Sequence, residues 1–318
     1  MEPEKSTLTP SPLQPLTVAD RGWFEKLLLA HGVGDPPLAA YSFPYHIIWR
    51  DLFYYEWLEL DGHVCVFATH SDGTFLALPP LGPDPCGPVM RRVFSFMAER
   101  NKVPGVSRIE NLPAGFAAPC RTLGYRVVPK AGDYLYCRAD LVALRGDRYK
   151  SQRASYNHCV KHSAPVVRPY RAADMSSCLG LFQSWQQNLE TRVHTGLARD
   201  LAADSLSAHR VALCDADALG LVGCIAEVGG RIAAYTLGYP LNDSVFCILV
   251  EIADRQVQGL SQYIFREFCR SLSRFQFINA MDDSGLEGLR RAKQSYHPEV
   301  ILPSYVVTEA GGDSRRLA

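Results

Sequence analysis

The sequence lacks the features of a secreted, membrane-spanning or strongly basic protein. Its 33 lysines and arginines equal its 33 aspartates and glutamates, so no overall charge attracts nucleic acid or acidic lipid. No apolar run reaches the roughly 18 uncharged residues of a transmembrane helix. The first residues, "MEPEKSTLTPSPLQPLT", contain acids and prolines in place of the apolar segment of a secretory signal. We expect a cytoplasmic protein with no transmembrane segment.

Paired cysteines and familiar catalytic signatures are also missing. The ten cysteines include no C-x-x-C pair, and Cys65, Cys224 and Cys247 lie in apolar stretches, as buried free thiols do. His158 and His162 have no evident second ligand pair, so we expect no metal site. There is no glycine-rich Rossmann turn, P-loop or serine nucleophile elbow. These absences argue against dinucleotide oxidoreductases, P-loop NTPases and α/β-hydrolases.

The patterns that are present predict an α+β protein of two tandem lobes, each a mixed, mostly antiparallel sheet flanked by helices. Residues 1–16 are expected to be a disordered arm and residues 310–318 a disordered tail. The first lobe, 17–144, begins with a helix capped at Thr17, followed by alternating strands within 56–79 that turn at Asp-Gly pairs. A helix over 87–101, a strand over 107–110, a helical stretch to 123 and two further strands complete it.

The second lobe, 145–309, is expected to carry the active site. It opens with a basic helix over 147–162, then a strand, a helix from 174 and a helical segment over 198–209. Three consecutive strands follow, "LGLVGCIAEV", "RIAAYTLGY" and "SVFCILVEI". A helix, a short strand, the segment "DDSGLEGLRRAKQSYHP" and a last strand, "SYVVTE", complete the lobe.

One candidate phosphate site lies where the strand ending at 252 leads into a helix. The pattern Gln256-x-x-Gly259-x-Ser261 resembles the pyrophosphate loop of the GNAT acyltransferase superfamily, although Ser261 stands where Gly or Ala is usual. A glycine turn and free N–H groups at a helix start accept such an anion. An ordinary helix start explains the same residues.

The basic helix is a second candidate. The segment 145–171 contains seven lysines and arginines, including Arg148, Lys150 and Arg153, but only one acid, Asp147. They can bind phosphates, with Tyr149 and Tyr156 stacking on bases, or they can form a solvated helix face.

Two further features can serve acyl transfer. Glu251, near the end of its strand, can act as a general base or pair with an arginine. In 282–298 we expect a helix that starts at the acids, with Ser284 able to cap it and Arg290, Arg291 and Lys293 in its last turn. Lys293 can turn into a cleft and stabilise an oxyanion.

These segments, in this order, resemble the phosphatidylglycerol lysyltransferase C-terminal domain family. The last is the most specific: acid-acid-x-Gly-x-x-Gly-Leu-Arg-x-Ala-Lys-x-Ser-Tyr-x-Pro, with Tyr296 before the proline. The resemblance implies tandem GNAT-like lobes of bacterial type, similar to Fem-type aminoacyl transferases. It also implies Lys293 at the reacting carbonyl, Glu251 at the end of the central strand, and tRNA phosphates on Arg148, Lys150 and Arg153.

The resemblance implies a transferase that moves an aminoacyl group from charged tRNA to an amine or hydroxyl acceptor, without a bound cofactor. The chain departs from the family at Ala280 and Met281, where Arg-Glu is usual, and at Ala154, where Asn is common. The lipid acceptor is not carried over, because the membrane segment of the lysyltransferases has no counterpart here. A CoA-dependent N-acyltransferase and a binding protein with a decayed site stay open as alternatives.

Overall fold

The computed structural model describes residues 12–31, 37–103, 105–190 and 196–310. Within these ranges it describes every side chain except those of residues 188–203. The chain forms two compact units, described here one at a time: Met1–Asp35, Phe53–Lys130 and Pro303–Ala318 make the first, Pro36–Leu52 and Ala131–Leu302 the second. These bounds differ from the contiguous lobes expected from the sequence, because strands β6 and β12 each run from one unit into the other. Most of the expected arm (1–11) and tail (311–318) fall outside the described residues.

The first unit contains a sheet in the order β1-β2-β3-β4-β5-β12. The expected antiparallel meander is confirmed as β2, β3 and β4, with its first turn at Asp61-Gly62, where both residues have positive φ. Gln14 and Pro15, expected in the arm, instead pair with β2. The strands are β1 (Gln14–Pro15), β2 (Tyr54–Leu60), β3 (His63–His70), β4 (Gly73–Leu76), β5 (Ile109–Pro113) and β12 (Val300–Thr308).

Successive side chains of β2 point to opposite faces of this sheet, and helices pack against them on both faces. Leu58 points into the core that α3 covers, whereas its neighbour Trp57 points to the other face and meets Trp23 of α1 at 4.3 Å between ring centroids. Thr17 precedes a short 3₁₀ turn, Val18–Asp20, and donates from its N–H and hydroxyl to the Asp20 carboxylate. The α-helices are α1 (Arg21–Ala30), α3 (Val89–Arg100) and α4 (Ala114–Thr122).

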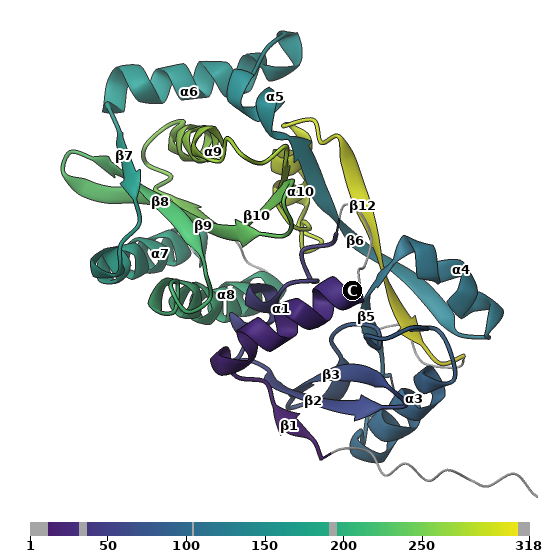
Figure 1. Ribbon diagram of the computed structural model, residues 1–318. Coiled ribbons are helices and arrows are strands. Elements are labelled where there is room, and N and C mark those ends of the chain that lie inside the picture. Colours follow the sequence, from purple (N-terminus) through teal and green to yellow (C-terminus); the bar gives the residue numbers. More distant parts are fainter. Residues whose placement is uncertain (1–11, 32–36, 104, 191–195, 311–318) are drawn as a thin grey trace, which may run out of the picture. The chain divides into compact units, whose positions relative to one another are not determined.

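The second unit contains a sheet in the order β6-β11-β10-β9-β8-β7, in which β10 and β11 alone are parallel (Figure 1). The two strands expected near 126 and 133 are one long strand, β6, since the chain stays extended through Gly132. A β-carbon at this glycine would lie 2.3 Å from the Leu302 carbonyl oxygen. The strands are β6 (Arg126–Cys137), β7 (Val166–Pro169), β8 (Val222–Val228), β9 (Arg231–Pro240), β10 (Val245–Ala253) and β11 (Phe277–Asn279).

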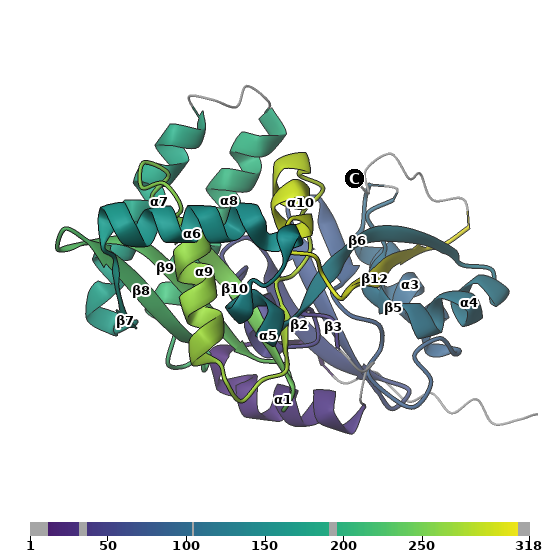
Figure 2. The ribbon, with the colours of Figure 1, turned by 90° about the horizontal axis from the view of Figure 1, so that it is seen from above.

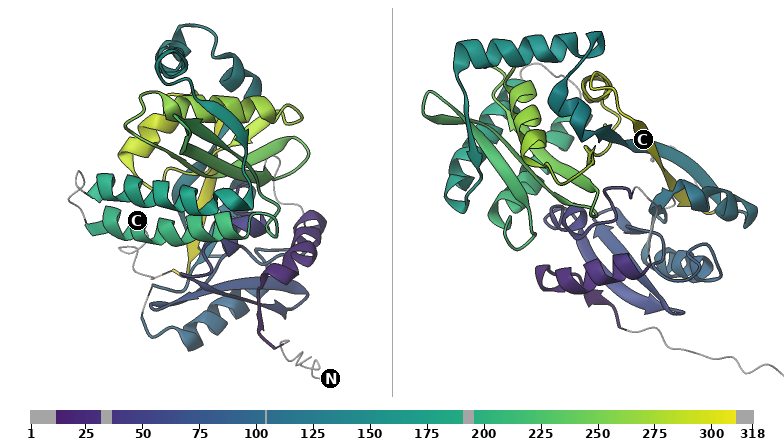
Figure 3. Two further views of the ribbon diagram at one scale, coloured as in Figure 1. Left: turned by 90° about the vertical axis from the view of Figure 1, so that its left-hand side faces the viewer. Right: turned by 45° about the horizontal axis from the view of Figure 1, so that its top comes forward.

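Helices cover both faces of this second sheet (Figure 1). Helices α6 and α9 lie over one face, where Figure 2 shows α6 crossing α9, and α7 and α8 lie side by side over the other, as the left view of Figure 3 shows. None of the described helices combines the length and apolar character needed to span a membrane. The α-helices are α2 (Phe43–Ile47), α5 (Arg138–Ala143), α6 (Lys150–Ser163), α7 (Met175–Glu190), α8 (Gly196–Cys214), α9 (Leu260–Ser271) and α10 (Glu287–Gln294).

The parallel strands β10 and β11 separate part-way along their length. Pairing covers Val245, Phe246 and Cys247 of β10 only, while β10 continues to Ala253 and remains paired with β9. The chain after β11 therefore leaves the sheet at Asn279. Among the described residues, no strand neighbours 248–251 of β10 on that side, and a pocket of the second unit lies here.

Candidate active site

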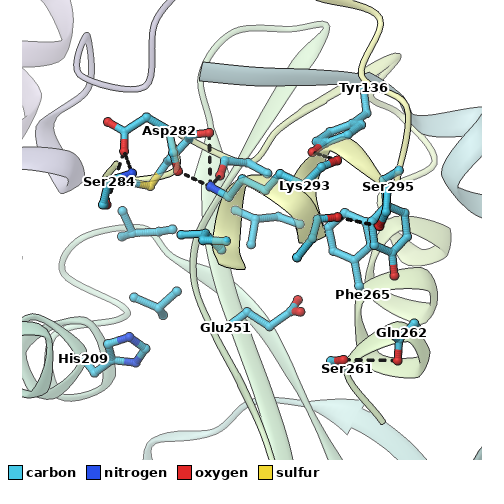
Figure 4. Close-up of a pocket in the computed structure, with 18 residues that line it drawn as sticks. Tyr136, His209, Glu251, Ser261, Gln262, Phe265, Asp282, Ser284, Lys293 and Ser295 are labelled. Carbon is cyan, nitrogen blue, oxygen red and sulfur yellow. Dashed lines mark hydrogen bonds between the residues drawn. The ribbon is translucent and has the colours of Figure 1, made fainter. Parts of the chain in front are cut away.

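A pocket of about 510 Å³ opens in the second unit where β10 and β11 part (Figure 4). Its wall is formed by the end of β10, the start of α9, the loop 280–284 and one side of α10. Tyr136 of β6 and His209 of α8 complete the lining. The polar side chains that reach it are Glu251, Ser261, Gln262, Asp282, Ser284, Lys293, Ser295 and His209. The structure thus brings Glu251, Ser261, Lys293 and Tyr296, all predicted from the sequence, into one pocket.

Glu251 is partly buried, and one of its two carboxyl oxygens is withdrawn from solvent. It lies opposite Thr236 in the register of β9 and β10, and its Oε2 is buried without a hydrogen-bond partner in the described part of the chain. Burial raises the pKa of Glu251 to about 8, against a small opposing effect of Thr236. No ion pair of Glu251 occurs among the described residues, so the expected alternative, pairing with an arginine, is wrong. At neutral pH this carboxyl is therefore mainly protonated, and it ionises as the pH approaches about 8.

Lys293 approaches the same pocket from α10, but its ammonium is already engaged. Its Nζ donates to the carbonyls of Ala280 at 2.6 Å, Met281 at 3.2 Å and Asp282. Burial lowers its pKa, while the nearby Asp282 and Asp133 carboxylates oppose that shift. An ammonium has three N–H donors, and all three are used here on the loop. Lys293 therefore fixes the loop 280–282 and places a positive charge at the pocket wall.

The acids of the 282–298 segment do not cap its helix, contrary to the expectation from the sequence. Helix α10 begins at Glu287, four residues beyond Asp283. Asp283 is almost fully buried and accepts hydrogen bonds from the Tyr134 hydroxyl at 2.8 Å and from Arg290 at 2.9 Å. Although burial opposes the effect, the Arg290 and Tyr134 hydrogen bonds lower the pKa of Asp283. The motif's second acid and its first arginine therefore lock α10 onto β6.

The start of α6 and the 3₁₀ turn before it, Asp147–Tyr149, hold the turn that follows Lys293. Tyr149 donates to the carbonyl of Tyr296 at 3.1 Å, and Gln152 donates to that of Ser295 at 2.7 Å. Tyr156 packs parallel to Tyr263 of α9, with 5.4 Å between ring centroids. Tyr149 is buried and Tyr156 partly buried, so the expectation that they stack on bases is wrong. Tyr156 faces inward from the apolar side of α6, and Tyr149 faces inward from the 3₁₀ turn that leads into this helix.

Most of the cations expected on the phosphate-binding face are exposed, and some are engaged within the chain. Arg153 caps the end of α5 by donating to the carbonyls of Leu144 and Gly146. Arg148 makes an exposed ion pair with Asp140 at 2.8 Å. Lys150 is exposed. On α10, Arg291 lies near Glu287 at 3.6 Å with both side chains largely in solvent.

The proposed pyrophosphate loop is not one site in this structure. Ser261 lines the larger pocket, whereas Gln256 lines a second pocket of about 330 Å³ beside Trp185. Gly259, at φ +82°, packs on α6, and a β-carbon there would lie 2.0 Å from the Ser155 carbonyl. Helix α6 therefore occupies the space next to the start of α9.

His209 is a pocket residue that sequence reasoning missed. Its Nδ1 lies 2.7 Å from the Tyr235 hydroxyl, and its ring packs on Phe182 at 4.5 Å between centroids. Burial lowers the pKa of His209 to about 3, so the ring is neutral at physiological pH. A single histidine inside a helix carries no sequence signal, because only the packing of α8 brings it to β10 (Figure 4).

Solved structures share this fold over nearly the whole chain. A conserved protein of unknown function from Bacteroides thetaiotaomicron aligns with TM-score 0.80 and 24% identity, covering 94% of this chain and 99% of that one. L-PGS from Bacillus licheniformis aligns with TM-score 0.62 and 13% identity, covering 93% of each chain. FemX aligns with TM-score 0.56 and 9% identity, covering 93% of this chain and 97% of that one.

These likenesses confirm the expected fold class. A tandem GNAT protein from the clavulanic acid biosynthesis pathway also aligns over 95% of this chain, with TM-score 0.50 and 11% identity. The chain is an α+β protein of two tandem GNAT-like lobes. No curated protein matches the sequence. The family model described as phosphatidylglycerol lysyltransferase, C-terminal, matches residues 37–308, and the chain belongs to that family.

Proposed function

We propose that this protein is an aminoacyl transferase that moves an aminoacyl group from charged tRNA to an amine or hydroxyl acceptor. The observation that carries the proposal is the pocket at the end of β10, where an isolated carboxyl and a lysine charge line one cavity. Family membership supports transfer chemistry in general, since the family is named for a lysyltransferase.

In the proposed reaction the acceptor nitrogen or oxygen attacks the carbonyl carbon of the aminoacyl ester. Glu251, in its ionised form, takes the proton that the acceptor loses. Negative charge develops on the carbonyl oxygen, and the Lys293 ammonium stabilises it. The C–O bond to the ribose then breaks, the ribose oxygen receives the proton held by Glu251, and the tRNA leaves with a free hydroxyl while Glu251 returns to its ionised form. His209, neutral and oriented by Tyr235, supplies a hydrogen bond to the bound group.

The hydrogen bonds that Lys293 makes to the loop 280–282 determine how it can stabilise the oxyanion. Because its three N–H donors are held by the loop 280–282, it acts on the oxyanion through its charge, at short range and in a partly desolvated site. Gln152 of α6 and Tyr149, just before this helix, hold the turn 295–296, and α6 also presents exposed cations such as Lys150. These cations are the proposed contacts for tRNA phosphates.

Gly259 weighs against the CoA-dependent alternative. A pyrophosphate bound in the manner of GNAT enzymes sits at the N-terminus of the helix that follows the glycine loop. Here the Ser155 carbonyl of α6 lies against Gly259. A carbonyl oxygen repels an anion, so α6 disfavours pyrophosphate at this place.

The test is filter binding of charged and uncharged bulk tRNA, with and without excess CoA, at low and moderate salt. We expect salt-sensitive binding that prefers charged tRNA and ignores CoA. Displacement of the tRNA by CoA would favour the acyl-CoA alternative. Absence of binding to either ligand would indicate a decayed site, consistent with Ala280 and Met281 in the pocket lining.

Lys293→Met tests the catalytic step, because methionine keeps the length of the side chain and removes its charge. We expect acyl transfer to fall by roughly 10²-fold or more, with tRNA affinity much less affected. Lys26→Met, at an exposed position of α1, is the matched control for the loss of a lysine charge. Unchanged transfer by a folded Lys293→Met protein would remove the catalytic role of this residue.

A further inference from the structure

The first unit contains a pair of thiols in direct contact, apart from the proposed reaction. Cys86 lies in the loop before α3, and Cys120 lies in α4, 34 positions later. Their sulfur atoms are 2.7 Å apart. A covalent sulfur–sulfur bond measures about 2.0 Å, so only a small movement separates this pair from bonding distance.

The surroundings hold the two sulfurs against each other. Both residues are buried in the apolar core under α3, at 4% and 0% exposure for Cys86 and Cys120. The Cys86 thiol also lies 3.7 Å from the Phe116 carbonyl, and the Cys120 thiol lies 3.9 Å from the Met90 sulfur. Either thiol can donate in this S–H···S contact, and the hydrogen bond with Cys86 lowers the pKa of Cys120 against the effect of burial. One thiol of the pair is therefore prepared to ionise first.

Cys86 lies in the segment 82–88, which forms neither helix nor strand. The stretch Gly82–Pro88 contains three prolines, and Pro83, Asp84 and Pro88 are exposed. Local opening of such a loop costs much less free energy than unfolding of the core. A small oxidant reaches the pair in this way, although both sulfurs are buried at rest.

We propose that Cys86 and Cys120 form a reversible disulfide, a modification site that links the loop before α3 to α4. With a small-molecule disulfide as oxidant, the Cys120 thiolate attacks one of its sulfurs and releases a thiolate. Cys86 then loses its proton and attacks the Cys120 sulfur, which releases the second small thiolate. Two protein thiols lose two protons and two electrons, and the oxidant is reduced to two thiols.

The consequence of the bond is a closed chain loop from 86 to 120 that contains α3 and β5. Cross-linking this loop restricts the unfolded chain and stabilises the first unit. The inference concerns the first unit and does not depend on the proposed aminoacyl transfer.

The test treats the full-length reduced protein with a series of oxidised-to-reduced glutathione ratios, followed by acid quenching, alkylation and tryptic mass spectrometry. Trypsin places Cys86 in peptide 51–91 with Cys65, and Cys120 in peptide 109–121. We expect these two peptides to be linked, two of the ten thiols to be lost, and dithiothreitol to reverse both changes. The melting temperature of the oxidised protein should rise by roughly 5 °C.

Variants identify the bond. Cys65→Ala should keep the link and the rise in melting temperature, whereas Cys86→Ala and Cys120→Ala should lose both. Alanine is the replacement because a buried cysteine behaves as a small apolar residue. The proposal is overturned if no linked peptide forms at any glutathione ratio, if the link involves Cys65, or if only glutathione adducts form.

Discussion

Glu251 and Lys293 line the same pocket, yet their charges are satisfied in opposite ways. The lysine has three carbonyl partners, while the Glu251 Oε2 has none among the described residues. A protein keeps an uncompensated buried carboxyl only at a cost in stability, and such groups concentrate at functional sites. The difference predicts that Glu251 contributes by gaining and losing a proton. Lys293 is expected to contribute both by holding the loop 280–282 and by its positive charge.

The raised pKa of Glu251 makes stability depend on pH. The unfolded carboxyl ionises near its ordinary pKa of 4.5, whereas the folded one holds its proton until about pH 8. Between these values the native state binds more protons, so wild-type stability falls as pH rises. Glu251→Gln should remove this slope and melt several degrees higher than wild type at pH 8, with the difference vanishing below pH 4.5.

The same group sets the pH dependence of transfer. If ionised Glu251 takes the proton of the acceptor, the rate should rise with pH and level off above about 8. Thermal melts and single-turnover rates of Glu251→Gln over pH 5–9 separate the two effects. A wild-type rate that is flat across this range would contradict the role of Glu251 as base.

Two neighbouring arginines of α10 provide a second test at single-residue resolution. Arg290 binds the nearly buried Asp283, whereas Arg291 makes a long, exposed pair with Glu287. Arg290→Ala should lower the melting temperature by about 2–5 °C because it leaves Asp283 without its cation. Arg291→Ala should change it by less than about 1 °C. Equal effects of the two substitutions would contradict this account of the motif.

At the scale of elements, the packing of α6 on α9 and on the turn 295–296 supports the wall of the pocket. Helix α6 packs its inner face on α9 and on the turn 295–296, and it approaches α9 at Gly259. The sequence pattern indicated a helix rich in positive charge. It did not indicate that Tyr149 and Gln152 would bind backbone carbonyls beyond Lys293, because those carbonyls are more than 140 residues away.

Gly259→Ala tests this packing. The glycine has φ +82°, and the added methyl would meet the Ser155 carbonyl, so we expect a loss of roughly 2–4 kcal/mol in unfolding free energy. Gly288→Ala in α10 is the matched control, since its methyl would meet nothing within 4 Å. That change should be neutral or slightly stabilising. Urea unfolding of both variants measures the difference, and a mild effect at Gly259 would refute close packing there.

At the scale of the whole molecule, the balanced charge makes any polyanion binding a local property. With 33 basic and 33 acidic side chains, salt-sensitive tRNA binding must come from clustered cations. The double variant Arg148→Ala/Lys150→Ala should reduce the slope of log affinity against log salt by roughly 1.5. Lys26→Ala, an exposed residue of α1, should leave the slope unchanged. Equal slopes in all three proteins would place the tRNA contacts elsewhere.

The sequence by itself determined most of the elements and the α+β class, because strand alternation, turn pairs and helix periodicity are local properties. It did not show that Gln14 and Pro15 pair with β2 or that β6 is one continuous strand. It also determined which side chains the 282–298 motif contributes. The tertiary structure decided what those side chains contact. Asp283 faces Tyr134, Lys293 faces the carbonyls of residues 280–282, and His209 enters the pocket from α8. These contacts join segments far apart in sequence, so local pattern carries no information about them. They depend on how β10 and β11 separate and on which helices pack beside the gap.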